Sequence, residues 1–188
     1  METTAHKDPS ADLDPARLVL LLATVLVGLS AGFFYTYEAS VTLGLAEVSD
    51  VGYVETFQAI NETIRNAGFA LMFFGAIPVL ALAAALNWGS ANRQARLALI
   101  AGLAFYLTGL AITATGNVPL NEQLAELTNV TTVGAGEARA AFEDSWNRLN
   151  LIRTVTFVGS FICVASVPFL SPKPAERSGF AAAMKQNR

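Results

Sequence analysis

Four long apolar runs, separated by polar connections, dominate the chain. The first extends from Leu18 to Tyr37 without a charged residue. At about 20 residues, such a run is long enough to cross a bilayer core of about 30 Å as a helix. The pattern therefore predicts an all-α integral membrane protein, a four-helix bundle over residues 15–171 with spans at about 18–37, 67–86, 97–115 and 151–170.

The first run has an alternative interpretation as a cleaved signal peptide. Lys7 and Arg17 form a basic flank, and residues 30–32 form a small-residue cleavage site. The run continues beyond this site, however, and three further runs follow it. This favours a membrane span, which begins with an Asp14-Pro15 pair suited to an N-cap and the first helical position.

The second and fourth helices are expected to extend beyond the membrane on the non-cytoplasmic side. Apolar residues recur at helical spacing from Val51 and merge with the second run, which predicts one helix over Val51–Leu86 with a kink at Pro78. A similar pattern leads from Glu137 into the fourth run, whereas the Thr- and Gly-rich residues 131–136 predict a loop.

The third run ends in a short polar stretch, Gly116-Asn117-Val118-Pro119-Leu120-Asn121. Proline has no amide hydrogen and is favoured in the first turn of a helix. Pro119 therefore predicts the end of one helix and the start of another. Asn117 and Asn121 flank this predicted break.

The distribution of basic residues predicts the orientation. We expect residues 1–14 to form a disordered tail. This tail together with Arg17, the 87–96 turn and the polar, basic tail at 172–188 carry all Lys and Arg residues except four. Those four, Arg65, Arg139, Arg148 and Arg153, lie in or beside the two longer connections. The positive-inside rule then predicts that both termini are cytoplasmic, with the cell (plasma) membrane as the expected location.

Composition supports lipid as the solvent and narrows the chemistry. Of the 188 residues, 53% are apolar and 14% are charged, against roughly 25% charged residues in a soluble domain. The single histidine, His6, lies in the N-terminal tail, and the single cysteine, Cys163, lies within the fourth run. Metal and haem sites commonly use such ligands, so we expect no metal site and no cofactor. A net charge of −3 without a basic stripe argues against nucleic acid as a partner.

Polar side chains from all four helices are expected to meet at the non-cytoplasmic end of the bundle. Glu38 follows the first run at the end of the first helix, and Asn61 and Arg65 share a face of the second helix. Arg153 is costly at the edge of hydrocarbon and is expected to pair with a carboxylate, Glu38 first and Glu143 second. The candidate site residues are Glu38, Asn61, Arg65, Asn117, Asn121, Trp146, Asn150 and Arg153. The alternative for each is a structural role as a helix cap, an interhelical hydrogen bond or part of an interfacial aromatic belt.

The stretch Asn117-Val118-Pro119-Leu120-Asn121, followed by Trp146, Asn150 and Arg153 with the spacing W-x3-N-x2-R, resembles the anthrone-oxygenase-like family of small membrane proteins. Residues 32–35 and 58–61 are also similar to that family, so the resemblance covers roughly 18–170. The positions that the family pattern marks are Asn61, Asn117, Pro119, Asn121, Trp146, Asn150 and Arg153. Glu38 and Arg65 are added from their positions alone.

The resemblance implies oxidation of a planar phenolic or polycyclic substrate by dioxygen, without a metal or flavin. In that interpretation, Glu38 is the candidate base, Arg153 stabilises the developing anion, and the amides and Trp146 bind the substrate. The alternative is a non-enzymatic protein, either a binder of an apolar small molecule or an accessory subunit of a membrane complex, as a homo-oligomer or with another membrane protein. A transporter is less well supported, because the spans lack internal repeats and a charged midplane residue.

Overall fold

The computed structural model describes residues 14–89, 92–128 and 130–170, and every regular element in these ranges is a helix. The expected tails, apart from Asp14, lie outside the described residues. In chain order, the elements are α1 (Pro15–Thr36), η1 (Tyr37–Val41), α2 (Thr42–Ala46), α3 (Asp50–Thr63), α4 (Ala67–Phe73), α5 (Ala76–Leu86), α6 (Arg93–Ile112), η2 (Thr113–Asn117), α7 (Val118–Ala125) and α8 (Thr132–Leu170). The predicted all-α class is confirmed.

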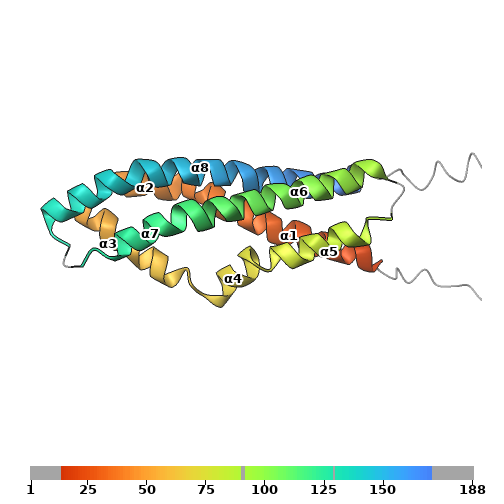
Figure 1. Cartoon of the computed structure of the whole chain (residues 1–188), viewed down its shortest axis with the longest axis horizontal. Coiled ribbons are helices and arrows are strands. Elements are labelled where there is room, and N and C mark those ends of the chain that lie inside the picture. The colour runs from red at the N-terminus through yellow and green to blue at the C-terminus, as the bar shows by residue number, and fades with distance from the viewer. Residues whose placement is uncertain (1–13, 90–91, 129, 171–188) are drawn as a thin grey trace, which may run out of the picture.

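Four helices in the described part of the chain are long and apolar enough to cross a membrane, at Pro15–Ala46, Ala67–Leu86, Arg93–Ala125 and Thr132–Leu170. In Figure 1, α1, α5, α6 and α8 lie side by side, and α2, α3 and α7 extend the bundle at one end. Large apolar side chains such as Leu71 (68% exposed) and Ile162 (61% exposed) face outwards. This outward apolar surface indicates an integral membrane protein surrounded by lipid.

The second helix is not continuous, so the expectation of a single helix over Val51–Leu86 was wrong. The chain leaves α3 at Thr63 and re-enters a helix at Ala67, where the Asn66 side chain accepts a hydrogen bond from the Phe69 amide as an N-cap. An asparagine side chain competes with helical hydrogen bonding and stabilises a new helix start instead.

The kink expected at Pro78 lies one turn earlier, between α4 and α5. Proline cannot donate to the carbonyl four residues before it, and its ring crowds that carbonyl, which here belongs to Phe74. Helix α4 ends at Phe73, and α5 begins after Gly75. A Cβ on Gly75 would lie 2.2 Å from the Leu71 carbonyl oxygen, so the kink requires glycine at this position.

The expected break at Pro119 was also wrong, because the chain remains helical from Arg93 to Ala125. The residues before the proline form the wide π-helical turn η2, in which the Val118 amide donates to the Thr113 carbonyl. A wide turn carries one extra residue and gives the proline ring the space that a regular α-turn would deny it. A second π turn, η1, carries the first helix past Glu38 to Ala46.

The loop expected at residues 131–136 is instead the first turn of α8. The Thr131 hydroxyl accepts a hydrogen bond from the Gly134 amide at 3.2 Å, and the Thr131 carbonyl accepts one from the Ala135 amide at 2.8 Å. A threonine N-cap thus starts a helix in a segment whose glycines suggested a loop.

Helix α6 and the π turn η2 that continues it pack closely on α8 along a seam of three glycines spaced seven residues apart, Gly102, Gly109 and Gly116. A Cβ on Gly109 would lie 2.7 Å from Phe157 and 2.8 Å from the Thr156 hydroxyl, and the other two positions are similarly crowded at 2.9 Å. The Ser160 hydroxyl donates to the Gly102 carbonyl at 2.8 Å. Small residues and interhelical hydrogen bonds of this kind hold helices together where lipid supplies no hydrophobic drive.

An aromatic core fills the centre of the bundle beside this seam. Phe157 stacks on Phe34 at 4.6 Å and meets Tyr106 edge to face at 4.9 Å. The Tyr106 hydroxyl donates to the Phe73 carbonyl at 2.7 Å, one of the carbonyls near the α4–α5 kink, and lies 2.9 Å from the Ser30 hydroxyl. The core therefore satisfies the backbone next to the kink and fixes the positions of Phe34 and Phe157.

The glycine seam predicts a penalty for added volume. Gly109→Ala should destabilise the protein by about 1–3 kcal/mol, because Phe157 is held by neighbouring rings and cannot move aside cheaply. Gly44→Ala is the matched control, since a Cβ there meets no atom within 4 Å. Unfolding midpoints in the same lipid or detergent would test this, and equal midpoints for the two variants would contradict it.

Candidate functional site

A buried arginine lies at the centre of the candidate site. Arg153, on α8, is only 6% exposed, and its guanidinium carbon lies 4.4 Å from the Phe34 ring centroid and 5.1 Å from that of Trp146. An unpaired cation is expensive at this depth, and the faces of two aromatic rings offset part of the cost. The arginine is therefore held as a cation between two planar groups.

Asn150, one turn earlier on α8, links this arginine to a carboxylate. Its Oδ1 accepts hydrogen bonds from Arg153 Nε at 3.1 Å and Nη2 at 2.7 Å, and its Nδ2 donates to Glu38 Oε1. The sequence led us to expect a direct Arg153–carboxylate pair. Instead, within the described residues, an amide separates the two charges, and Glu143 pairs with Arg139.

The π turn η1 presents Glu38 to α8. The turn keeps the chain helical while adding a residue, so the side chains after it are rotated relative to those of α1. Tyr37 is buried beside Glu38, and its ring lies 5.2 Å from Phe33 and 5.8 Å from Trp146. Glu38 itself is partly buried, so the carboxylate sits at the edge of an aromatic enclosure.

The second π turn places Asn117 against the same part of α8. Asn117 is fully buried, and its Nδ2 donates to the Trp146 carbonyl at 3.3 Å, while its Oδ1 has no hydrogen-bond partner in the described structure. One turn later, Asn121 Oδ1 accepts a hydrogen bond from Trp146 Nε1 at 2.8 Å. Both amides face α8 as expected, although they do so from a continuous helix.

Two of the expected residues form no hydrogen bond with these side chains in the described structure. Asn61, on α3, has a buried Nδ2 without a partner among the described residues, and no hydrogen bond joins it to Glu38, Asn150 or Arg153. Arg65 is exposed in the break between α3 and α4. The break explains this, because the two residues do not share a face of one continuous helix as assumed. We define the polar cluster as Glu38, Asn117, Asn121, Trp146, Asn150 and Arg153.

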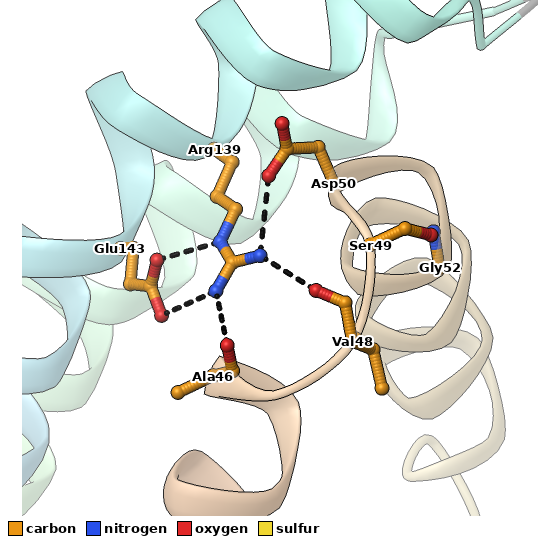
Figure 2. A network of polar contacts seen from close by, with 7 residues as sticks. All are labelled: Ala46, Val48, Ser49, Asp50, Gly52, Arg139 and Glu143. Carbon is orange, nitrogen blue, oxygen red and sulfur yellow. Dashed lines mark hydrogen bonds and ion pairs between the residues drawn. The ribbon is translucent and has the colours of Figure 1, made fainter.

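Arg139 forms a second polar centre that the sequence did not reveal (Figure 2). Its guanidinium donates to both oxygens of Glu143, to Asp50 Oδ1 at 3.1 Å and to the carbonyls of Val48 and Ala46 at 2.9 and 3.1 Å. These bonds engage all three guanidinium nitrogens of the arginine. Arg139 thereby clamps the turn between α2 and α3 to α8.

An aromatic ring completes this clamp. The guanidinium carbon of Arg139 lies 4.6 Å from the centroid of the Tyr53 ring. Burial, reinforced by nearby Glu143, raises the pKa of Tyr53, so the phenol stays neutral beneath the cation. Only the Arg139–Glu143 spacing of four residues was visible in the sequence; Asp50 lies 89 residues from Arg139 along the chain.

The side chains of the polar cluster close on one another. A cavity of about 140 Å³ lies between α7 and α8, lined by Leu120, Gln123, Leu124, Ala138, Ala141 and Phe142. It adjoins the cluster because Phe142 stacks on Trp146 with centroids 6.1 Å apart. The described residues contain no group of three His, Cys, Asp or Glu side chains placed to hold a metal ion.

Fold and cluster together define an integral membrane helical bundle with a buried polar centre. Residues 69–163 match the protein family described as Anthrone oxygenase. The match covers half of the chain, which therefore belongs to the anthrone oxygenase family. It includes Asn117, Asn121, Trp146, Asn150 and Arg153 but not Glu38. No curated protein and no solved structure matches the chain.

The clamp yields a prediction about stability. Arg139→Gln should destabilise the protein by about 1–3 kcal/mol, because it removes charge-assisted hydrogen bonds to two carboxylates and two carbonyls. Arg148→Gln, at an exposed position on the same helix, is the control. Thermal unfolding midpoints would test this. A midpoint shift for Arg139→Gln that is no larger than the shift for Arg148→Gln would contradict it.

Proposed function

We propose that this protein is an oxygenase that acts on a planar phenolic or polycyclic substrate at the polar cluster, using dioxygen without a metal or flavin. The observation that carries the proposal is the buried chain Glu38–Asn150–Arg153, which places a proton acceptor and a cation on the two ends of one amide. Membership of the anthrone oxygenase family supports the same substrate class.

The proposed reaction converts a ring methylene group flanked by aromatic rings into a ketone. A base removes one proton, and the resulting carbanion, delocalised as a phenolate-like anion, transfers electrons to dioxygen and forms a carbon–oxygen bond. The peroxide then loses the second hydrogen as its O–O bond breaks. In sum, one methylene group and one dioxygen molecule give one ketone and one water molecule, so that the substrate carbon is oxidised and dioxygen is reduced.

Each step has a candidate residue in the cluster. Glu38 accepts the first proton, because it is the carboxylate of the cluster and lies at its edge. Arg153 stabilises the anion, since a buried, preoriented cation acts strongly where water is excluded. The unpartnered Oδ1 of Asn117 accepts a hydrogen bond from a substrate hydroxyl, and Trp146 forms an aromatic wall beside the Arg153 guanidinium.

One observation favours the alternative, a non-enzymatic binder or accessory subunit. The hydrogen bonds of the cluster run between its own residues, as they would in a purely structural lock between helices. In that case, the cluster would fix helix register and the protein would show no turnover.

The positive-inside rule supports an orientation with both termini in the cytoplasm of a cell whose plasma membrane holds the protein. The polar cluster and the Arg139 clamp then lie towards the non-cytoplasmic side, where α2, α3 and α7 extend the bundle (Figure 1).

Glu38→Gln should lower the turnover number by about 10²–10⁴, because it removes the base and keeps the side-chain shape. The assay is oxygen uptake with 1,8-dihydroxyanthrone in lipid nanodiscs, corrected for uptake in empty nanodiscs. Glu55→Gln, an exposed carboxylate on α3, is the control. Arg153→Lys should also lose activity, since an ammonium cannot make both bonds to Asn150. Equal rates in all variants, or no uptake by the wild type with a panel of hydroxyanthrones, would refute the proposal.

Orientation is tested with reporters fused to the C-terminus. A fluorescent protein that matures only in the cytoplasm should fluoresce, and an alkaline phosphatase fusion, which needs an oxidising compartment, should be inactive. A dark fluorescent fusion with an active phosphatase fusion would show that the C-terminus lies outside the cytoplasm.

A further inference from the structure

An apolar groove on the membrane-facing side of the bundle leads towards the polar cluster. It has a volume of about 700 Å³ and lies between α1, α4 and α8, lined by Thr24, Val25, Gly28, Leu29, Gly32, Phe33, Thr36, Met72 and Phe161. Two glycines on α1 hollow this face. A Cβ on Gly32 would meet no atom within 4 Å, and one on Gly28 would lie 3.0 Å from the Phe161 ring.

The inner wall of the groove touches the enclosure of the polar cluster. Phe33 lines the groove, and its ring centroid lies 5.3 Å from that of Phe34 and 5.2 Å from that of Tyr37. Phe34 carries the Arg153 guanidinium on its face, and Tyr37 precedes Glu38 in the chain. Two rings, Phe33 and then Phe34, therefore lie between the lipid-facing groove and the Arg153 guanidinium.

The chemistry of the lining selects a flat apolar ligand. The hydroxyls of Thr24 and Thr36 each donate at 2.8 Å to a carbonyl of their own helix, which occupies their donors. The remaining walls are aliphatic, aromatic or thioether groups, which pack well against ring faces. A polar edge on such a ligand would find its partners only deeper, beyond Phe33. The volume falls within the roughly 300–1,000 Å³ of small-molecule sites.

We propose that this groove is the entrance from the bilayer through which a planar polycyclic phenol reaches the polar cluster, and that Phe33 is the gate between them. The inference rests on the proposed function for its substrate class. A hydrophobic polycycle partitions into the membrane, so a lateral entrance at the hydrocarbon level receives it without passage through water.

The test fills the groove at Gly32. Association of 1,8-dihydroxyanthraquinone, a stable planar probe that the protein does not consume, is followed by its own absorbance after rapid mixing with nanodiscs and corrected with empty nanodiscs. An obstructed entrance slows access to the site, so Gly32→Trp should lower the association rate constant at least tenfold, and Gly32→Leu should lower it less. Gly44→Trp is the matched control, because a Cβ there also meets no atom within 4 Å and Gly44 does not line the groove. It should change the constant less than twofold.

The outcomes separate the entrance from the reaction. If the probe associates with Gly32→Trp as fast as with Gly44→Trp, or if the wild type binds none, the groove is a lipid-filled seam and the entrance proposal is overturned, whatever the oxygen uptake. If the graded slowing of association is found but the wild type oxidises no hydroxyanthrone, the entrance stands and the oxygenase proposal fails. Normal helicity and elution of each variant show that the folds are comparable.

Discussion

The structure depends on how one buried cation, Arg153, is accommodated. Moving a guanidinium to this depth is unfavourable unless its hydrogens and its charge find partners. Here Asn150 occupies two of its N–H groups, and the rings of Phe34 and Trp146 cover its faces. These partners fix α1 against α8, because Phe34 belongs to the former and Arg153 to the latter. Phe157 in turn fixes Phe34 and lies against the glycine seam of α6.

The two π turns follow from the same requirement. A regular helix rotates each residue by about 100°, so one inserted residue moves all later side chains around the axis. In η1 the insertion comes where α1 changes from packing with Phe34 to presenting Glu38 to Asn150. In η2 it comes where α6 changes from the glycine seam to presenting Asn117. Wide turns are frequent at functional sites, and both of these deliver a side chain of the polar cluster.

Much of this could be predicted from the sequence. The apolar runs predicted the four spans, and helical spacing placed Trp146, Asn150 and Arg153 on one face with Asn117 and Asn121 opposite. The errors have two causes. Some are local: Pro119 does not break its helix, because a π turn absorbs the ring, and Thr131 starts a helix that glycines seemed to forbid. Others depend on distant contacts: the sequence pattern does not reveal the Arg139 clamp or the amide between Glu38 and Arg153, because the partners lie about a hundred residues apart along the chain.

The closed cluster and the open groove are compatible if the cluster exchanges partners on binding. In the structure, Asn150 donates to Glu38 with one end and accepts from Arg153 with the other, which stabilises both charges without a ligand. A phenolic oxygen that reaches Arg153 past Phe33 would replace Asn150 Oδ1 as the acceptor, so the exchange would cost little hydrogen bonding. Rotation of the amide would also release the Glu38 carboxylate. The residue that locks the empty site would thereby couple arrival of the anion-forming group at the cation to release of the base, and the cation would keep an acceptor throughout.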